Sequence, residues 1–418
     1  MSKTDDQPFL PVIIQSGQYA YGVARSFYEA YRMKSLVLEP SMKTKDIRTL
    51  LLGEALGIAT QNSGILDFQY VDRLDEADFF VQALIEVAMQ FKHKKLILLV
   101  CDCYYAELII INKKTLQHYF ILPYIDEDVM KRVQTKEEFY KQCDLYNLKY
   151  PKTFVLTKEH RVTSELPFDY PIIIKPSNFV EYSRCSFPEK KKVFLVKNEE
   201  EKQHIIKSIY RSSYKDALIL QEFIPGDDSY IRVLDVYVGK DKKVKLMCLG
   251  NKLLEDPSPQ NIGISLAIMT DFDKQLMDNL RYFLEDIGYS GFANFDMKLD
   301  VRDGKFKIFE MNLRSGASSY YVTASGHNLM QCVANDYVFN VHQELTYVQT
   351  RHLWSLIPKR LLFKGLKNEK LKIQAKQLIK QDKYSNALYF REDMNVKRWV
   401  KLKLYNFYLN LKYKKYYK

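Results

Sequence analysis

The chain has 418 residues, more than a single hydrophobic core usually organises, so two or three domains are expected. Hydrophobic residues make up 47% and charged residues 27%, as in globular proteins, and no apolar run reaches the ~20 residues that span a bilayer. The stretch MSKTDDQPFL lacks the parts of a secretory signal, and the six cysteines follow neither a disulfide framework nor a common zinc spacing. We therefore expect a cytoplasmic protein with reduced thiols.

The first part of the chain, 1–125, alternates strand and helix patterns. The sequence shows no GxGxxG motif, so it does not indicate a dinucleotide site. Strand, turn, helix and strand in close succession predict a parallel βαβ unit. Apolar runs predict buried strands over 11–14, 35–39 and 95–101. Helical spacing of apolar residues predicts helices over 20–31 and 75–91.

The middle part, 126–345, predicts an α+β domain. TKEEFYKQCDLYNL carries a helix-start signature, because Thr135 can cap the helix and Glu138 stands three residues later. YPIIIKPS predicts a buried strand that carries Lys175 near its end, with KKVFLVK as its partner strand. Two later hairpins are expected, IRVLDVYVG with VKLMCLG, and GFANFDMKLDV with KFKIFEMNL, with an amphipathic helix at 273–287 between them.

The stretch FEMNLRSG places three polar side chains two residues apart, at Glu310, Asn312 and Arg314. Side chains with this spacing on a strand point to the same face, so a carboxylate, an amide and a guanidinium would project together. One interpretation is a strand that runs out into a polar loop. The other is a site for a metal ion and a phosphate.

Pairing register brings a second acid to the same face. A two-residue turn would place Asp296 opposite Met311, with the acids on opposite faces. A three-residue turn over 302–304, with Gly304 left-handed, sets Asp296 opposite Glu310 instead. We expect the second register because it gathers an apolar face from Phe295, Met297, Leu299, Phe309 and Met311.

Asp296, Glu310 and Asn312 would then supply hard oxygen ligands, and these suit Mg²⁺, which takes one or two carboxylates together with phosphate oxygens. Lys298 lies on the same face and offers a simpler alternative, a plain ion pair with one of the acids.

The order of these motifs resembles the ATP-grasp superfamily of carboxylate–amine ligases. Lys136 stands at a helix start, Lys175 ends a strand, QEFIPGDD follows, and FDMK with FEMNLRSG closes the series. The resemblance covers roughly 130–330, and it implies an ATP-grasp fold at 126–345 after a parallel-sheet pre-ATP-grasp domain at 1–125. The segment 346–418 is expected to be a basic, helical C-terminal addition.

The resemblance implies ATP and Mg²⁺ as cofactors and a role for each matching position. Lys136 and Lys175 would hold the α- and β-phosphates, and Asp296, Glu310 and Asn312 would bind Mg²⁺. Arg314 would face the carboxylate that is activated. Arg232, on a strand just past the QEFIPGDD turn, is expected either to face the same pocket or to form a structural ion pair. The nucleoside would be held by Gln221, by the backbone of Glu222, Phe223 and Ile224, and by Asp228 at the ribose.

Two positions depart from the family pattern. Many members have a glycine-rich phosphate loop after the strand lysine, whereas PSNFVEYSRCSFPEKKK contains no glycine. A lid at 176–192 would have to use Ser177, Asn178, Arg184 and the lysines at 190–192. Asn294 stands where D-alanine–D-alanine ligases carry an arginine, which argues against membership of that group.

A narrower likeness extends over the length of the chain. SGQYAYGVARSFYEAYRMKSLVLE, YNLKYPKTFVL and FEMNLRSGASSYYVTASGHN are similar to the D-aspartate ligase group of low-G+C Gram-positive bacteria. The likeness implies that D-aspartate is joined through its β-carboxylate to the lysine side chain of a peptidoglycan precursor. The acceptor would be an anionic muropeptide, nucleotide-linked or lipid-linked. A ligase of the same fold for another amino acid or dipeptide is the alternative.

The net charge of +12 is concentrated towards the end, where VKRWVKLKLYNFYLNLKYKKYYK has no acid. Such a stretch suits anionic partners, including the inner membrane face, although Lys- and Tyr-rich composition throughout a genome would also produce it. A helix that packs on the ligase core is a further interpretation. A nucleic-acid-binding protein is the alternative of another class. The ordered ligase motifs argue against it, and no nucleic-acid partner is expected.

Overall fold

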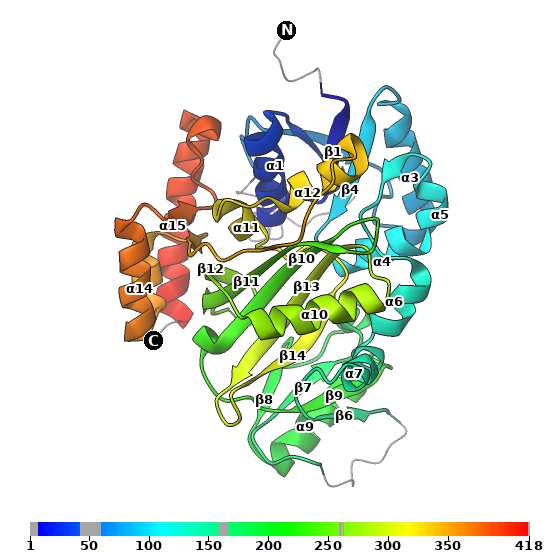
Figure 1. Cartoon of the computed structure of the whole chain (residues 1–418). Helices are drawn as coiled ribbons and strands as arrows, with labels where there is room; N and C mark the ends of the chain where they lie inside the picture. The colour runs from blue at the N-terminus through cyan, green and yellow to red at the C-terminus, as the bar shows by residue number, and fades with distance from the viewer. Residues whose placement is uncertain (1–6, 42–59, 159–165, 259–260, 262, 417–418) are drawn as a thin grey trace.

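The computed structural model describes residues 7–41, 60–158, 166–258, 261 and 263–416. Three sheets organise these residues, and Figure 1 shows them stacked along the molecule from the N-terminal domain to the small sheet at the opposite end. The expected combination of a parallel α/β domain, a mixed α+β domain and a helical C-terminal segment is confirmed.

The N-terminal domain contains a parallel five-stranded sheet with the order β3-β2-β1-β4-β5. Because the chain moves outwards from β1 in both directions, the carboxyl ends of β1 and β4 lie at a switch point, where open α/β sheets form a crevice. The described elements are β1 (Phe9–Ile14), α1 (Gln18–Tyr31), β2 (Ser35–Pro40), β3 (Leu66–Val71), α3 (Ala77–Met89), β4 (Lys95–Val100), α4 (Cys103–Ile111), α5 (Lys113–Leu116), β5 (Phe120–Ile121) and α6 (Glu127–Val133).

A small antiparallel sheet follows, with the order β6-β9-β7-β8. Thr135 caps α7 as expected, since its hydroxyl accepts the backbone N–H of Glu138 at 3.2 Å. β7 also pairs with β8 as the sequence indicated. The elements of this unit are α7 (Lys136–Leu145), β6 (Thr153–Leu156), β7 (Ile172–Pro176), α8 (Phe179–Arg184), β8 (Phe194–Val196), α9 (Glu199–Tyr210) and β9 (Leu218–Glu222).

The central sheet has the order β14-β13-β10-β11-β12-β16-β17, with β15 paired beside β11. One face packs on α10 and the other turns towards α1, α11 and α12 (Figure 1). Its elements are η1 (Asp228–Tyr230), β10 (Ile231–Val238), β11 (Val244–Glu255), β12 (Ser265–Asp271), α10 (Lys274–Asp286), β13 (Gly291–Asp300), β14 (Lys305–Asn312), α11 (Tyr320–Ala324), α12 (Leu329–Ala334), η2 (Asn335–Phe339) and β15 (Thr346–Tyr347).

The hairpin of β13 and β14 has the expected pairing at its polar end but a different turn. Asp296 pairs with Glu310, as predicted. The turn has four residues, however, because Asp300 pairs with Lys305, and a bulge at Phe309 restores the register. The prediction for the apolar face was therefore wrong at Phe309. Ile308 is the buried core residue, whereas Phe309 leaves the core and lies below the Lys175 ammonium, 5.8 Å away.

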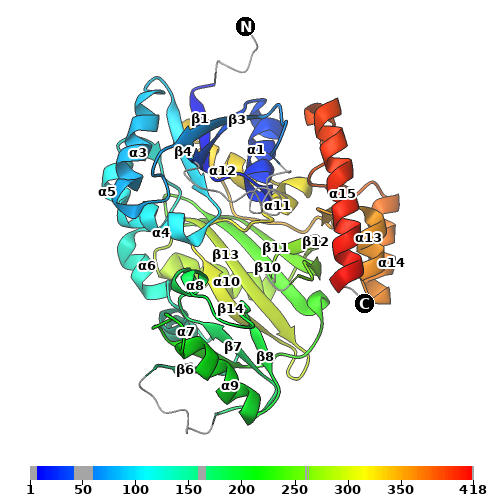
Figure 2. The same cartoon turned by 180° about the vertical axis from the view of Figure 1, so that it is seen from behind.

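The C-terminal segment is part of the main structure and adds strands to the central sheet. Figure 2 shows its helices side by side along one flank of the molecule. Leu402, Leu409 and Tyr413 enter the same hydrophobic core as the N-terminal helix α1, so α15 packs on the rest of the protein, as one interpretation of the sequence expected. The elements are β16 (Leu353–Ser355), α13 (Lys359–Gly365), α14 (Glu369–Lys380), β17 (Tyr384–Asn386), η3 (Arg391–Asp393) and α15 (Val396–Tyr416).

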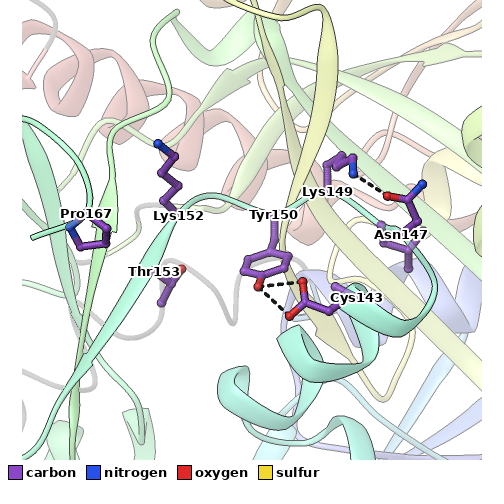
Figure 3. Close-up of a pocket in the computed structure, with 9 residues that line it drawn as sticks. Cys143, Asn147, Lys149, Tyr150, Lys152, Thr153 and Pro167 are labelled. Atoms are coloured by element: carbon purple, nitrogen blue, oxygen red, sulfur yellow. Dashed lines mark hydrogen bonds between the residues drawn. The ribbon is translucent and has the colours of Figure 1, made fainter.

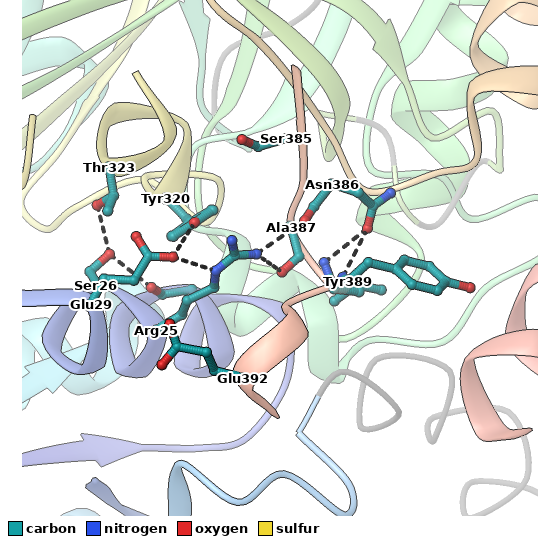
Figure 4. A network of polar contacts seen from close by, with 12 residues as sticks. Arg25, Ser26, Glu29, Tyr320, Thr323, Ser385, Asn386, Ala387, Tyr389 and Glu392 are labelled. Atoms are coloured by element: carbon teal, nitrogen blue, oxygen red, sulfur yellow. Dashed lines mark hydrogen bonds and ion pairs between the residues drawn. The ribbon is translucent and has the colours of Figure 1, made fainter. Parts of the chain in front are cut away.

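A buried arginine joins the N-terminal domain to this segment (Figure 4). The Arg25 guanidinium donates to Glu29 at 2.7 Å and to the carbonyls of Asn386 and Ala387 at 3.1 and 3.0 Å. It also lies between the rings of Tyr320 and Phe390, 4.5 and 4.4 Å from their centres. The contact therefore ties three distant parts of the chain together.

Candidate active site

Two carboxylates face each other where the central sheet meets the small sheet. Asp296 of β13 is paired with Glu310 of β14, and their side chains are 24% and 40% exposed. Both carboxylates therefore remain accessible from the solvent side. Two carboxylates that are direct cross-strand neighbours would repel each other without cations nearby.

Two lysines from the small unit supply positive charge to Glu310. The Lys136 ammonium, at the first position of α7, lies 3.2 Å from the Glu310 carboxylate. The charge of Lys136 holds the pKa of Glu310 well below its usual range, with Lys175 and Lys192 adding to the effect. Burial, reinforced by the charge of Lys136, lowers the pKa of Lys175 to about 7. Three lysines and one acid thus share one electrostatic site.

A further cation, Lys252, pairs with Asp296 and was missed by the sequence analysis. The Lys252 ammonium donates to Asp296 at 3.2 Å, to Glu255 at 3.0 Å and to the carbonyl of Gly263 at 3.2 Å. Burial lowers its pKa and the carboxylates of Asp296 and Glu255 raise it, with a net shift upwards. A lysine inside the apolar strand VKLMCLGNKLLE was the available signal, because such a charge is rarely buried without a partner.

Asp235 was also missed by the sequence analysis. The available signal was again a charged residue inside an apolar strand, RVLDVYV. Its side chain is buried and accepts the backbone N–H of Gly316 at 2.7 Å. Burial raises the pKa of Asp235 to about 6. A Cβ at Gly316 would lie 2.8 Å from the Asn294 amide nitrogen, so glycine is needed for the close approach of this loop to the sheet.

Asn312 and Arg314 continue from Glu310 into the crevice of the N-terminal domain. The Asn312 amide donates to Asn294 at 3.1 Å and to Asp296 at 3.3 Å, and its oxygen accepts from Arg314 at 3.3 Å. The Nε of Arg314 is buried and has no hydrogen-bond partner. Arg314 therefore keeps one donor free at this point.

The N-terminal domain closes this crevice with the carboxyl ends of its strands. Tyr19, near the start of α1, makes a hydrogen bond of 3.0 Å with Ser315. The thiol of Cys103, the first residue of α4, lies 3.5 Å from the Asn312 oxygen. The segment that carries Arg314 therefore sits at the switch point between β1 and β4.

The predicted nucleoside-binding stretch lies on β9 and just after it. The Gln221 side chain is buried, and its oxygen accepts from Lys175 at 3.0 Å while its nitrogen donates to Tyr140 and Thr153. Gln221 therefore orients Lys175. The Glu222 carboxylate accepts from the Lys152 backbone and pairs with Arg302. The Lys298 ammonium lies over the ring of Phe223, 5.5 Å from its centre, and Ile224 is buried.

Asp228 and Lys298 lie further along this side of the site. The Asp228 carboxylate accepts the Glu255 N–H at 3.1 Å and borders a cavity of about 350 Å³. Burial, together with the charge of Glu255, raises the pKa of Asp228. Lys298 donates to the carbonyl of Gly226, and Asp296 is held by Lys252, so the simpler alternative of a Lys298–Asp296 pair is replaced by another pairing.

Arg232 does not belong to this cluster, and the prediction that it faces the same pocket needs correction. It pairs across the sheet with Met297, whose side chain lies in the core on the opposite face from Asp296. Its guanidinium bonds to Asp271 at 2.9 Å and to Asn251 at 2.8 Å. The structural ion pair, the other interpretation of Arg232, is what the structure shows.

The glycine-free segment after Lys175 forms the short helix α8 and a loop. Lys190 donates to the carbonyl of Cys185, and its ammonium lies over the Tyr182 ring. Lys192 acts on the pKa values of both Glu310 and Lys175, so this end of the segment does reach the charged site. Its use as a phosphate lid stays a prediction.

A second cavity, of about 370 Å³, is lined by residues of the small unit and not by Asp296 or Glu310 (Figure 3). It is bordered by Tyr150, which stacks on Tyr140 with ring centres 4.4 Å apart. Tyr140 donates to the carbonyl of Phe309 and accepts from Gln221, so this cavity adjoins the support of the site. Its lining residues are Cys143, Asp144, Asn147, Leu148, Lys149, Tyr150, Lys152, Thr153 and Pro167.

The donor set suits a magnesium ion that is shared with a polyphosphate. Across the described ranges, no cluster of three or more His, Cys, Asp and Glu side chains forms a protein-only metal cage. Two carboxylates and one amide oxygen are what Mg²⁺ takes when phosphate oxygens complete its shell. The residues fit this ion, with the Asn312 oxygen turned towards Arg314 in this structure.

Comparisons with known proteins agree with this arrangement. No family model matches the chain. The D-aspartate ligase of Enterococcus faecium (strain Aus0004) is 39% identical over 415 residues, which cover 96% of this chain and 95% of the relative.

Solved structures share the fold at low identity. An L-amino acid ligase from Bacillus licheniformis is 14% identical, with a TM-score of 0.54 and coverage of 78% of this chain and 74% of that one. An N5-carboxyaminoimidazole synthetase from Staphylococcus aureus, solved with ADP, is 13% identical, with a TM-score of 0.58 and coverage of 83% and 82%. PurK, an N5-carboxyaminoimidazole ribonucleotide synthetase solved as an ADP complex, is 14% identical, with a TM-score of 0.57 and coverage of 91% of this chain and 88% of that one. These three likenesses show the fold.

The full-length similarity to an enzyme of known activity and the fold lead to one conclusion. The chain belongs to the D-aspartate ligase family and is an ATP-dependent carboxylate–amine ligase with the ATP-grasp fold.

Proposed function

We propose that this ligase activates the β-carboxylate of D-aspartate with ATP and joins it to the lysine side chain of a peptidoglycan precursor. The observation that carries the proposal is the direct pairing of Asp296 with Glu310, flanked by Lys136 and Lys175. The full-length similarity to a D-aspartate ligase supports the choice of amino acid.

ATP would lie between the small sheet and the central sheet. Lys136 and Lys175 come from the small unit and are compact charges suited to phosphates. Asp296, Glu310 and Asn312 would hold Mg²⁺, which neutralises charge on the transferred phosphoryl group. The backbone of Glu222 to Ile224 would face the adenine and Asp228 the ribose, with the Gln221 side chain positioning Lys175.

The amino-acid carboxylate would bind at Arg314. A guanidinium matches a carboxylate in shape and charge, and the unpartnered Nε supports this role. The carboxylate oxygen attacks the γ-phosphorus of ATP, the bond to the bridging oxygen breaks, and ADP leaves. The product is an acyl phosphate. Arg314 would keep the carboxylate in line during this step.

The acceptor amine then attacks the acyl carbon. The tetrahedral intermediate expels inorganic phosphate and loses a proton, which leaves an amide. The Ser315–Gly316 segment, held by Tyr19 and Asp235, supplies donors beside this position. Exclusion of water matters because acyl phosphates hydrolyse, and the 176–192 segment with Lys192 would provide the cover.

The acceptor we propose is a muropeptide carried on an anionic nucleotide or lipid. The enzyme would then act in the cytoplasm, at or near the inner membrane face. All six cysteines are free thiols, which suits that compartment.

A substrate screen tests the proposal. Purified protein with ATP, Mg²⁺ and a muropeptide acceptor is incubated with single D- or L-amino acids, and ADP release and the mass of the product are followed. We expect turnover and a mass gain with D-aspartate. Turnover only with another amino acid, or formation of a free dipeptide, would contradict the D-aspartate assignment while leaving the ligase chemistry in place.

A further inference from the structure

The C-terminal helix α15 is apolar on two opposite faces. A helix that packs against a protein usually shows one apolar stripe and one polar face, so a second stripe indicates a second contact. The inward face of α15 is formed by Arg398, Leu402, Leu409 and Tyr413, all of them buried. Arg398 is completely buried and pairs with Asp393. The inward face is therefore satisfied by the rest of the chain.

The outward stripe recurs with helical spacing along the opposite side. Its members are four or three residues apart, which keeps them on one line of the helix. Their exposed fractions are far above those of core residues, and Trp399 stands beside them at 49%. We call this set the outer stripe: Val396 at 79%, Val400 at 44%, Leu404 at 63%, Phe407 at 65% and Leu411 at 49%.

Positive charge surrounds the outer stripe. Residues 394–418 contain no Asp or Glu, and the segment 346–418 has nineteen Lys and Arg against four Asp and Glu, a net charge of +15. Lys397, Lys403, Lys414 and Lys415 are exposed. Of these, Lys403 lies over the Trp399 ring and Lys415 over the Tyr416 ring, so their charges border the aromatic part of the surface.

The position of α15 leaves this surface open. Figure 2 shows the helix along the flank of the molecule beside α13 and α14, away from the N-terminal domain's helices α3 and α5. Within the described ranges, no helix is both long enough and apolar enough to cross a bilayer. A contact by α15 would therefore be lateral, with the helix lying along a surface.

Charge decides between the partners that such a surface fits. A second copy of this chain would bring two acid-free lysine-rich helices together, and like charges would oppose that contact. An anionic lipid surface attracts the lysines and accepts the apolar side chains at the level of its headgroups. Tryptophan is a side chain that favours this interface.

We propose that α15 docks the enzyme on an anionic lipid bilayer, with the outer stripe inserted at the headgroup level and the neighbouring lysines on lipid phosphates. The inward face of the same helix stays packed on the protein. This assignment is independent of which amino acid or acceptor the ligase uses.

The two tryptophans of the chain provide a direct reporter. Trp354 is 1% exposed in the core and Trp399 lies beside the outer stripe, so a change in tryptophan emission on binding reports Trp399. The full-length protein is titrated with vesicles of phosphatidylcholine mixed with phosphatidylglycerol, and separately with phosphatidylcholine alone. We expect a blue shift and protection from an aqueous quencher with the anionic vesicles, and weaker binding at high salt.

Variants separate the apolar and the charged contributions. The triple variant Leu404→Gln, Phe407→Gln and Leu411→Gln should weaken binding to anionic vesicles at least about tenfold, as should Lys397→Gln combined with Lys403→Gln and Lys415→Gln. The matched control replaces three equally exposed side chains elsewhere, at 65%, 76% and 62%: Tyr70→Gln, Leu145→Gln and Tyr282→Gln. The control should bind like the wild type. Thermal unfolding of all three variants should match the wild type because the replaced side chains are exposed.

Four results would overturn the proposal. The first is the absence of binding to anionic vesicles by the folded wild-type protein. The second is a dimer, measured by light scattering, that the outer-stripe variant abolishes. The third is salt-sensitive binding of oligonucleotides that the lysine variant removes, together with no vesicle binding. Equal binding by the outer-stripe variant and the control would also contradict the assignment.

Discussion

The Lys136 ammonium lies 3.2 Å from the Glu310 carboxylate, so the start of α7 and the end of β14 are joined by a charge pair across two sheets. Lys252 stands in the same relation to Asp296, also at 3.2 Å. In the absence of other cations, each carboxylate has a lysine as its counter-ion. Nucleotide and Mg²⁺ would then exchange these internal pairs for phosphate–lysine and metal–carboxylate contacts.

Glu310→Gln tests the metal assignment. The substitution keeps the shape of the side chain and removes its charge, so ADP release should fall at least about a hundredfold. Raising the Mg²⁺ concentration should recover part of the rate. ADP release is measured against Mg²⁺ concentration, with Glu344→Gln, whose side chain is 88% exposed, as the control. Wild-type turnover by Glu310→Gln would contradict the assignment.

The lowered pKa of Lys175 predicts proton uptake when nucleotide binds. In the free protein this pKa is about 7, so at pH 8 the side chain is mostly neutral. Phosphates favour the charged form and raise the pKa, so binding should take up close to one proton at pH 8 and almost none at pH 6. Calorimetric titration in buffers of different ionisation enthalpy measures this uptake. Lys175→Met should abolish it, and an uptake that persists in this variant would exclude Lys175 as its source.

The same lysine should lower stability on the acidic side. Folded Lys175 releases its proton near pH 7, whereas an unfolded lysine holds it to about 10.5, so the unfolded state binds more protons in between. The free energy of unfolding therefore rises with pH between about 7 and 10.5 because of this group. Below pH 7, where Lys175 is charged in both states, the cost of burying its charge in the folded state is fully present. Lys175→Met should raise the unfolding temperature by about a few degrees at pH 6, with a smaller difference at higher pH. A variant less stable at pH 6 than the wild type would contradict this.

Arg314→Lys should affect the amino-acid substrate more than the nucleotide. Lysine keeps the charge but loses the planar pair of donors, so kcat/KM for the amino acid should fall about 10- to 100-fold. The KM for ATP should change little. Initial rates with each substrate varied in turn provide the measurement. A rise in the KM for ATP with an unchanged kcat/KM for the amino acid would place Arg314 at the nucleotide instead.

Arg232→Met provides the contrasting arginine, on the opposite face of the sheet. The variant loses the bond to Asp271, which retains a second partner in Arg351 at 2.7 Å. We expect the free energy of unfolding to fall by about 1–3 kcal/mol, with unchanged KM values for the folded enzyme. Denaturant unfolding and initial rates test both parts. A changed amino-acid KM with unchanged stability would return Arg232 to the active site.

Arg25→Met should loosen the C-terminal segment. Arg25 is buried, and its loss removes the donor of two carbonyls and the counter-ion of Glu29, which keeps the Tyr320 hydroxyl, so the cost should be about 3 kcal/mol. Arg32→Met is the matched control at the residue that follows the same helix, since Arg32 pairs with Glu392 but is 60% exposed. That change should cost less than about 1 kcal/mol. Equal costs in denaturant unfolding would show that the buried network adds nothing.

Local patterns predicted a large part of this architecture. The burial pattern of FEMNLRSG and FDMK was enough to bring Asp296 opposite Glu310, because the register that gathers the apolar side chains on one face also brings these two acids together. The turn itself was not predictable, since a four-residue turn with a bulge at Phe309 reaches the same register as a three-residue turn. Capping by Thr135 is likewise a local interaction and was confirmed.

Contacts between distant segments were beyond this reasoning. The face occupied by Arg232 depends on which strands lie beside β10, and its partner Asp271 is 39 residues away. Lys252 meets Asp296 across 44 residues, and Arg25 meets Ala387 across 362. Each of these pairs is set by the packing of whole elements, which the spacing of residues within one element does not encode.

The position of β16 and β17 in the central sheet affects how the protein is made. They pair at the edge next to β12, yet they are synthesised later than the other strands of that sheet. Until they emerge from the ribosome, the backbone of β12 presents unpaired hydrogen-bonding groups to other nascent chains. The N-terminal sheet can form early in translation, whereas the sheet that carries the carboxylate pair is completed only when these two later strands have been synthesised.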